Sequence, residues 1–379
     1  NNYCKNYSLT KQIKVSNSLK FLTKCSKSYR KSLNTKIIAI TGSCGKTTLK
    51  EMIGNTLKQV SKTTFSPKSF NNKFGVPLSL FNLKQNDEFG IFEVGMDKKG
   101  EIDSLTKIVK PDLGVITNIS YAHSKNFQNI KKIADAKAEI MNNIQKNGII
   151  VLNMDDKFFK YHEKIALKKK LKVISFGIKN KSSTVNLKSF RKIKGKYELL
   201  IDVMGNKMTF YSDNNNKNNL YNILATLASI YSYFDIKKLK KNNFLDFKTP
   251  SGRGDISKIS LKRKKIFLVD ESYNSNPLSL KTAIENYDDI ENSNSKKYLI
   301  LGDMLELGKH SLKQHRLMSE IINKTRIHKV YVIGRYIKET YKRLNKEKKA
   351  QILNDKSDII DLINNNLNNN DYLMIKGSN

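Results

Sequence analysis

Short apolar runs alternate with amphipathic stretches along most of the chain. After 36 polar, lysine-rich residues, the apolar runs of the first half are IIAI (37–40), GIFEVG (90–95), LGVITNIS (113–120) and GIIVLN (148–153). Buried strands that alternate with helices are typical of a mostly parallel sheet covered by helices. The first helix should begin at the glycine loop that follows the first strand, with Leu49, Met52, Ile53 and Leu57 on one apolar face.

The pattern of apolar and polar residues changes twice in the second half of the chain. Within 171–212, YELLIDVMGNKMTFYS predicts two alternating strands around a Gly205-Asn206 hairpin, and a helix should follow over 219–234. Pro and Gly then interrupt the chain at TPSGRGD (249–255). A new series follows, with strands predicted at KIFLVD, KKYLILGD, KVYVIG and DYLMIKG and helices at 279–290, 311–324 and 357–367.

This pattern predicts an α/β protein with two domains. We place a central domain with a mostly parallel sheet at 37–250 and a smaller, Rossmann-like α/β domain at 251–379. Residues 1–36 have only a weak helical pattern and are too few to form a domain.

Composition narrows the class of protein. No apolar run approaches the roughly 20 residues that cross a bilayer, and the first residues lack a signal peptide, so we expect a soluble, cytoplasmic protein without a membrane partner. Three widely spaced cysteines, Cys4, Cys25 and Cys44, make neither a disulfide framework nor a zinc set. The net charge of +36 would fit a nucleic-acid-binding protein, but the lysines are scattered and do not alternate with aromatic residues. A solvated lysine surface is the better interpretation, with no specific nucleic acid as partner.

A short glycine loop follows the first strand, in IIAITGSCGKTTLKEM (37–52). A strict Walker loop would need glycine at position 40, where the chain has Ile40. Backbone N–H groups at a helix N-terminus still converge on an anion, Lys46 can reach terminal phosphates, and the Thr47 hydroxyl suits Mg²⁺. A plain glycine turn before a capped helix would explain the glycines and the threonine but not Lys46.

Four further side chains could belong to such a site. Glu93 ends an apolar strand, so it is either a metal ligand or an exposed edge residue. Asn118 and His123 follow the next strand, where a lone histidine is usually solvated or a cap. In KKIADAKAEIM (131–141), Lys137 shares a face with Ile133, so it either extends outward to water or has a role at the phosphate site.

The chain resembles a known family, the ATP-dependent Mur ligases of peptidoglycan precursor synthesis. The resemblance runs from about residue 15 to the end and is carried, in order, by ITGSCGKTTLKEM, SFNNKFGVPLSL, FEVGMDKKGEI, GVITNISYAH, IADAKAEIM, VLNMDD, LYNILA, PSGRGD, VDESYNSNP, LGDMLELG and IKGS. This family and its folylpolyglutamate synthase relatives use the short glycine loop. Three of the motifs (FNNKFGVP, DESYNSNP and GDMLELG) are most similar to the branch that adds D-alanyl-D-alanine to a UDP-linked muramoyl tripeptide.

The resemblance implies roles for individual residues. ATP phosphates would be held by Gly42, Ser43, Cys44, Gly45, Lys46, Thr47 and Thr48. One Mg²⁺ would be bound by Thr47 and Glu93 and a second by His123 and Lys137, the lysine as a carbamate; Lys46, Lys137, His123 and Glu93 form the implied catalytic set. The adenine side would be lined by Asn118, Asn219 and Asn222, with Arg253 on phosphate and Asp270 on the ribose. The peptide substrates would contact Asn71, Asn72, Tyr273, Asn274, Asn276 and Lys376.

The implied reaction is an ADP-forming amide ligation. The tripeptide carboxylate attacks the γ-phosphate to give an acyl phosphate, which the amine of D-Ala-D-Ala then attacks, in a monomeric enzyme. The chain departs from the family at Asn218, where a histidine is usual. The family's uridine-binding domain is expected to be largely absent and the C-terminal domain incomplete, as in a fragment or a reduced homologue. The alternatives are another Mur-type or folylpolyglutamate-type ligase, a basic nucleic-acid-binding protein, and a nucleotide-binding scaffold without activity.

Overall fold

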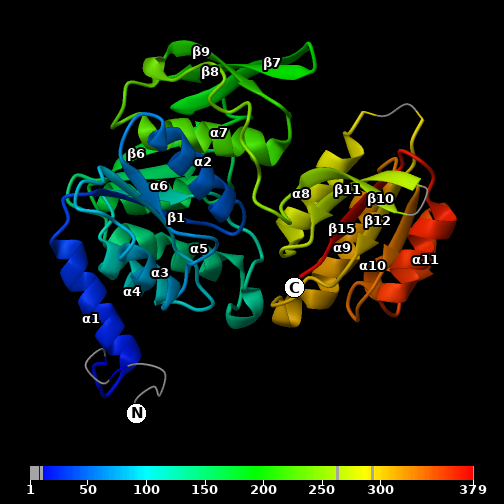
Figure 1. Cartoon of the computed structure of the whole chain (residues 1–379), viewed down its shortest axis with the longest axis horizontal. Helices are drawn as coiled ribbons and strands as arrows, with labels where there is room; N and C mark the ends of the chain where they lie inside the picture. The colour runs from blue at the N-terminus through cyan, green and yellow to red at the C-terminus, as the bar shows by residue number, and fades with distance from the viewer. Residues whose placement is uncertain (1–7, 9–11, 262–263, 292–293, 379) are drawn as a thin grey trace.

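The computed structural model describes residues 8, 12–261, 264–291 and 294–378. Its strands form two separate sheets, which lie in two lobes of the molecule (Figure 1). Both sheets are mostly parallel, as the alternating pattern predicts. The domain limits at 250 and 251 stay a prediction, but the second sheet begins close by, at Asp255.

The first sheet has the order β2-β3-β1-β4-β5-β6-β7-β8-β9. Its strands are β1 (Lys36–Thr41), β2 (Thr63–Phe65), β3 (Phe89–Glu93), β4 (Leu113–Ile116), β5 (Ile149–Asn153), β6 (Lys172–Gly177), β7 (Val185–Ile193), β8 (Lys196–Val203) and β9 (Asn206–Ser212). Pairing is parallel as far as β7 and antiparallel from β7 to β9. The carboxyl ends of the parallel strands therefore share one edge, where ligands gather in such sheets.

Helices cover both faces of this sheet. One face packs against α2 (Lys46–Lys58) and α7 (Lys217–Ile230). The opposite face packs against α3 (Gly75–Leu80), α4 (Glu101–Val109), α5 (Ile130–Ala138) and α6 (Phe159–Lys168). The predicted apolar face of α2 is confirmed, since Leu49, Met52, Ile53 and Leu57 are buried in the core.

The first helix, α1 (Ser18–Lys31), lies outside these layers against α3 and α4. The Asn17 side chain caps it by accepting a hydrogen bond from the backbone N–H of Lys20. Near its other end the buried Arg30 guanidinium donates to the Val109 and Leu33 carbonyls, which fixes the helix to the end of α4.

The second sheet has the order β10-β11-β15-β12-β13-β14. Its strands are β10 (Asp255–Leu261), β11 (Lys264–Glu271), β12 (Lys297–Leu301), β13 (Lys329–Val332), β14 (Lys349–Ile352) and β15 (Tyr372–Lys376). One face is covered by α8 (Pro277–Asp288) and α9 (Ser311–Asn323), with the short α10 (Lys338–Lys342) beside α9. The other face is covered by α11 (Lys356–Asn366).

Several predicted elements end earlier than the sequence pattern suggests. The strand expected over 113–120 stops at Ile116, because residues 117–120 turn back to bind the glycine loop. The hairpin turn is Met204-Gly205, one residue earlier than expected, and both residues have positive φ, as tight hairpin turns require. The helix containing Lys137 ends at Ala138 and continues as a 3₁₀ turn over Glu139–Asn142.

Two predictions from composition can be compared with this fold. Among the described residues, every helix is too short or too polar to cross a membrane. Cys25 and Cys44 are free thiols, and Cys4 lies outside the described residues.

Candidate active site

The glycine loop lies between β1 and α2 and is held by the segment that follows β4. Gly45 precedes α2 with a φ of 81°, a conformation that favours glycine. A Cβ on Gly42, whose φ is 148°, would lie 1.8 Å from Thr117 Oγ1. Thr117 Oγ1 instead donates to the Cys44 carbonyl at 2.6 Å, and the Asn118 side chain accepts from the Cys44 N–H at 3.0 Å. Asn118 thus supports the loop, and its amide is used there.

Two lysine ammonium groups meet at one carbonyl oxygen of the loop. Lys46 Nζ donates to the Gly42 oxygen at 3.0 Å, and Lys137 Nζ donates to the same oxygen at 2.9 Å. Lys137 is 2% exposed, so the alternative that it extends outward to water is wrong. Burial, and after it the charge of Lys46, lowers the pKa of the Lys137 amine well below its ordinary value. This shift makes the neutral amine, the form that reacts with CO₂, more accessible than it is for an exposed lysine.

Glu93 lies at the start of α2 rather than at an exposed edge, so that alternative is also wrong. It is 1% exposed, and its two oxygens accept from Thr47 Oγ1 at 2.6 Å and from Asn71 Nδ2 at 2.7 Å. A hydroxyl and a carboxylate side by side at a phosphate loop are the oxygen ligands that Mg²⁺ prefers. This arrangement brings together Thr47, Asn71 and Glu93 from three separate motifs.

A cavity of about 280 Å³ opens in front of the loop and is lined by both domains. The predicted site residues that line it are Ser43, Cys44, Gly45, Lys46, Thr47, Thr48, Asn71, Glu93, His123, Asn219, Asn222, Arg253, Tyr273, Asn274, Asn276 and Lys376. Gly42, within the loop, and Lys137 do not line the cavity, but they contact each other through a hydrogen bond. The structure therefore gathers most of the predicted residues around one cleft.

Three further predicted residues do not line this cavity: Asn118, which is held against the glycine loop, Asn72 and Asp270. The Asn72 side chain caps α3 by accepting from the N–H groups of Phe74 and Gly75, which explains its place before that helix. Asp270 lines a separate cavity, and its Oδ1 accepts from Ser272. Successive residues of a strand point to opposite faces, so Glu271 lines the main cavity where we expected Asp270.

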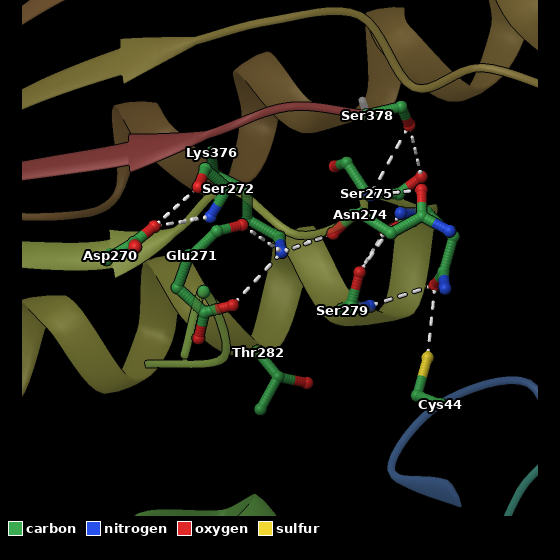
Figure 2. A network of polar contacts seen from close by, with 12 residues as sticks. Cys44, Asp270, Glu271, Ser272, Asn274, Ser275, Ser279, Thr282, Lys376 and Ser378 are labelled. Atoms are coloured by element: carbon green, nitrogen blue, oxygen red, sulfur yellow. Dashed lines mark hydrogen bonds and ion pairs between the residues drawn. The ribbon is translucent and has the colours of Figure 1, made fainter. Parts of the chain in front are cut away.

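The wall from the second domain is built around a buried ion pair (Figure 2). Lys376 Nζ lies 3.1 Å from Glu271 Oε2 and donates to the Asn274 carbonyl at 3.0 Å and, at 3.4 Å, to the Glu271 carbonyl. All three N–H groups of this ammonium are thus used within the second domain. Asn276 caps α8 and also accepts a hydrogen bond from the Cys44 thiol, 3.2 Å from its Oδ1, so the glycine loop contacts the second domain directly. Burial, in turn, raises the pKa of that thiol.

Arg253 and Tyr273 close the cavity from another side. The Arg253 guanidinium stacks 4.0 Å from the centre of the Tyr273 ring, and both side chains donate to Ser69 Oγ, at 3.3 Å and 2.7 Å. Ser69 lies within 3.5 Å of Thr47 Oγ1. Sequence reasoning missed Ser69, although it begins the SFNNKFGVPLSL motif.

Polar amides line the side of the cavity next to α7. Asn222 is 7% exposed, and its Oδ1 would lie 3.4 Å from a Cβ placed on Gly45. Asn219 donates to Ser212 Oγ at 2.8 Å. Asn218, the position that departs from the family, also lines the cavity. These amides leave room for a neutral, hydrogen-bonding group.

His123 lies at the rim between the two domains. Its Nδ1 is 2.5 Å from Glu306 Oε2 and 3.2 Å from Asp97 Oδ1. Burial, and then the charge of Lys46, lowers the pKa of its imidazole. Sequence reasoning did not single out Asp97 or Glu306, although both belong to quoted motifs, because nothing in the sequence indicates that these motifs meet.

Comparisons with known proteins agree with this geometry. A profile of the Mur ligase middle domain matches residues 40–230, and one of the Mur ligase glutamate ligase domain matches residues 258–379. The UDP-N-acetylmuramoyl-tripeptide–D-alanyl-D-alanine ligase of Buchnera aphidicola from Acyrthosiphon pisum is 33% identical over 84% of this chain and 69% of its own length. The protein of that name from Bacillus subtilis is 29% identical over 97% of this chain and 78% of its own.

Solved structures share the fold. A crystal structure of MurF from Acinetobacter baumannii is 24% identical, covers 97% of this chain and 79% of its own, and has a TM-score of 0.86. The MurF ligase of Thermotoga maritima, solved in complex with ADP, is also 24% identical and has a TM-score of 0.82 over 97% of this chain and 82% of its own. With a family profile across half of the chain and a curated relative above 30% identity, this chain belongs to the Mur ligase family.

Proposed function

We propose that this protein is an ATP-dependent ligase that joins D-alanyl-D-alanine to UDP-N-acetylmuramoyl-tripeptide through an acyl phosphate. The observation that carries the proposal is the meeting of Lys46, Lys137 and the Thr47–Glu93 pair around one glycine loop. The names of the curated relatives supply the substrates. Because ATP and a nucleotide-linked precursor are the proposed substrates, we place the reaction in the cytoplasm.

The residues of the loop fit the phosphates of ATP. A side chain at Gly42 would collide with Thr117, so only a bare backbone can pass there, and the free N–H groups at the start of α2 face the cavity. The buried Lys137 ammonium and the half-buried Lys46 ammonium share one carbonyl, which leaves much of their charge uncompensated by the protein. A polyanion in the cavity would supply that compensation.

The same residues fit two divalent cations. Thr47 and Glu93 would hold one Mg²⁺, and His123 with a carbamylated Lys137 would hold the second. The low pKa of the Lys137 amine supports the carbamate, because CO₂ adds to a neutral amine and turns a buried cation into an oxygen ligand. When bound, Mg²⁺ neutralises charge on a transferring phosphoryl group.

In the proposed mechanism the chain contributes position and electrostatics. Lys46 stabilises negative charge on the phosphoryl group, while Asn71, already held by Glu93, lies where the attacking carboxylate would arrive. The carboxylate oxygen attacks the γ-phosphorus and ADP leaves. The amine of the dipeptide then attacks the acyl carbon, releasing phosphate and a proton. Tyr273 and Asn276 hold the second domain against Ser69 and Cys44, which excludes water from the acyl phosphate.

The test is ADP release by the protein at its natural full length. We expect release that requires ATP, Mg²⁺, the UDP-linked tripeptide and D-Ala-D-Ala together, in proportion to enzyme concentration, as for a monomer that supplies the whole site. Activity with glutamate or a diamino acid in place of D-Ala-D-Ala would assign it to another branch of the family. Nucleic-acid affinity that falls steeply with salt, without amine-dependent ADP release, would refute the ligase proposal.

A further inference from the structure

Asp97, His123 and Glu306 form a cluster of potential metal ligands at the junction of the two domains. One ligand atom from each lies within 4.8 Å of the other two. Asp97 follows β3 and His123 follows β4, whereas Glu306 follows β12 in the second sheet. The cluster is therefore complete only when both domains are in contact.

The nitrogen at the centre of this cluster is poorly satisfied by protein groups. His123 Nδ1 is shielded from solvent, and although two carboxylate oxygens lie at 2.5 Å and 3.2 Å, neither contact has the direction of a hydrogen bond. A shielded ring nitrogen that lies beside two carboxylates without a hydrogen bond to either is better satisfied by a cation placed among the three groups.

We propose that Asp97, His123 and Glu306 bind a divalent cation that bridges the two domains of the ligase. One imidazole nitrogen and two carboxylate oxygens suit Mn²⁺ or Zn²⁺ better than Mg²⁺, which prefers oxygen ligands alone. The site shares His123 with the second Mg²⁺ proposed above but takes its other ligands from Asp97 and Glu306. The inference does not depend on the identity of the substrates.

Neighbouring contacts already hold Glu306 in place for this role. The Lys125 N–H donates to the Glu306 carbonyl at 2.8 Å, and Ser124 Oγ donates to the Leu307 carbonyl at 3.3 Å. A Cβ on Gly308 would lie 2.9 Å from the Cα of Lys125, so the two loops approach more closely than a side chain would allow. Because these contacts do not involve the carboxylate itself, replacing the carboxylate should leave the loops in contact.

The experiment is a Mn²⁺ titration of the full chain followed by electron paramagnetic resonance, in the absence of nucleotide. A Glu93→Gln, Lys137→Met background removes the two magnesium sites of the proposed mechanism, so one Mn²⁺ per chain should still bind to it. Adding Glu306→Gln, or Asp97→Asn as an independent variant, should weaken that binding at least about tenfold. The control, Glu320→Gln, changes an exposed glutamate of the same domain and should bind Mn²⁺ as the background does.

A second readout locates the ion. A crystal of the background variant grown with Mn²⁺ should show an anomalous peak among the three side chains. If the background binds no Mn²⁺, or binds it equally well with Glu306→Gln and Asp97→Asn, the cluster is an ion pair only and the proposal is overturned. Either result leaves the ligase proposal intact, because that proposal is tested by ADP release from the unmodified protein.

Discussion

Replacing Gly42 by alanine should damage both the fold and nucleotide binding, and the structure sets the size of the effect. The new Cβ would lie 1.8 Å from Thr117 Oγ1 and 3.1 Å from the Thr117 backbone nitrogen, so a side-chain rotation alone cannot remove the collision. The φ of 148° adds backbone strain of about 1–3 kcal/mol. Displacing Thr117 also breaks its hydrogen bond to the Cys44 carbonyl, worth about 0.5–1.5 kcal/mol. We therefore expect Gly42→Ala to lose roughly 2–4 kcal/mol of stability.

The matched control is Gly205→Ala in the hairpin between β8 and β9. Gly205 also has a positive φ, 84°, but a Cβ there meets nothing within 4 Å. The Gly205→Ala substitution should therefore lower the stability only by the backbone strain of a left-handed alanine, about 1–2 kcal/mol. For a domain of this size each kcal/mol of stability corresponds to about 2–4 °C in melting temperature. The melting temperature should therefore fall by roughly 4–16 °C in Gly42→Ala and by less in Gly205→Ala.

Calorimetric titration with ATP separates the local effect from the global one. We expect ATP affinity to fall at least about tenfold in Gly42→Ala, since each lost loop hydrogen bond to a charged group is worth about 1.5–3 kcal/mol, and to stay unchanged in Gly205→Ala. Equal losses of stability in the two variants, with ATP binding intact in both, would refute the argument that Gly42 is required by its close approach to Thr117.

Three other predictions follow from the same contacts. Lys137→Met should abolish ADP release and remove a pH dependence of stability. The folded pKa of Lys137 lies below its unfolded value, so the unfolded state binds more protons at pH values between the two. The stability of the wild-type protein should therefore rise with pH through that window more than the stability of the variant does, which urea unfolding at several pH values would reveal. Glu93→Gln keeps one oxygen that can accept from Asn71, and its NH2 group can donate to the Thr47 hydroxyl, but it loses the charge. It should therefore lower the affinity for MgATP by about 10–100-fold and leave metal-free ATP binding nearly unchanged; equal losses in both titrations would exclude a metal role. Tyr273→Phe removes only the hydroxyl bonded to Ser69 and should raise the KM for ATP by roughly 2–10-fold. Tyr273→Ala also removes the ring that stacks on Arg253 and should raise the KM further. Identical KM values for the two variants would show that the stacking does not matter.

The strongly periodic parts of the chain were predictable from sequence. The helix after the glycine loop has apolar residues at a helical spacing, and the buried strands on either side of it are short apolar runs. These elements are found as expected. β10 and β14 were missed because they lie at the edges of the second sheet, where one side of a strand is not covered and the apolar pattern is weak. β2 was missed because it has only three residues.

The candidate site was predictable where a residue's role depends on its own motif and less so where it depends on a distant one. Glu93 and Lys137 were singled out because each is a charged residue in an apolar setting that needs a partner, and Thr47 because it follows Lys46 in the glycine loop. Asp270 was expected from the family resemblance and Glu271 was not, because a motif does not reveal which face of a strand each residue occupies. Asp97 and Glu306 are ordinary acidic residues in sequence and acquire meaning only where two loops about 200 positions apart meet at His123.

The charge of the cleft connects the fold to the proposed chemistry. Lys46 and Lys137 donate to the same oxygen, so their mutual repulsion is only partly offset within the protein, while Lys376 is fully paired and contributes little free charge. The uncompensated charge is therefore concentrated at the glycine loop, where a terminal phosphate would lie, and not at the wall of the second domain. Arg253 adds a cation from that domain only because its stacking on Tyr273 holds it against Ser69. An anion at the loop would thus be drawn toward both domains at once, which makes the closed arrangement and the binding of phosphate mutually dependent.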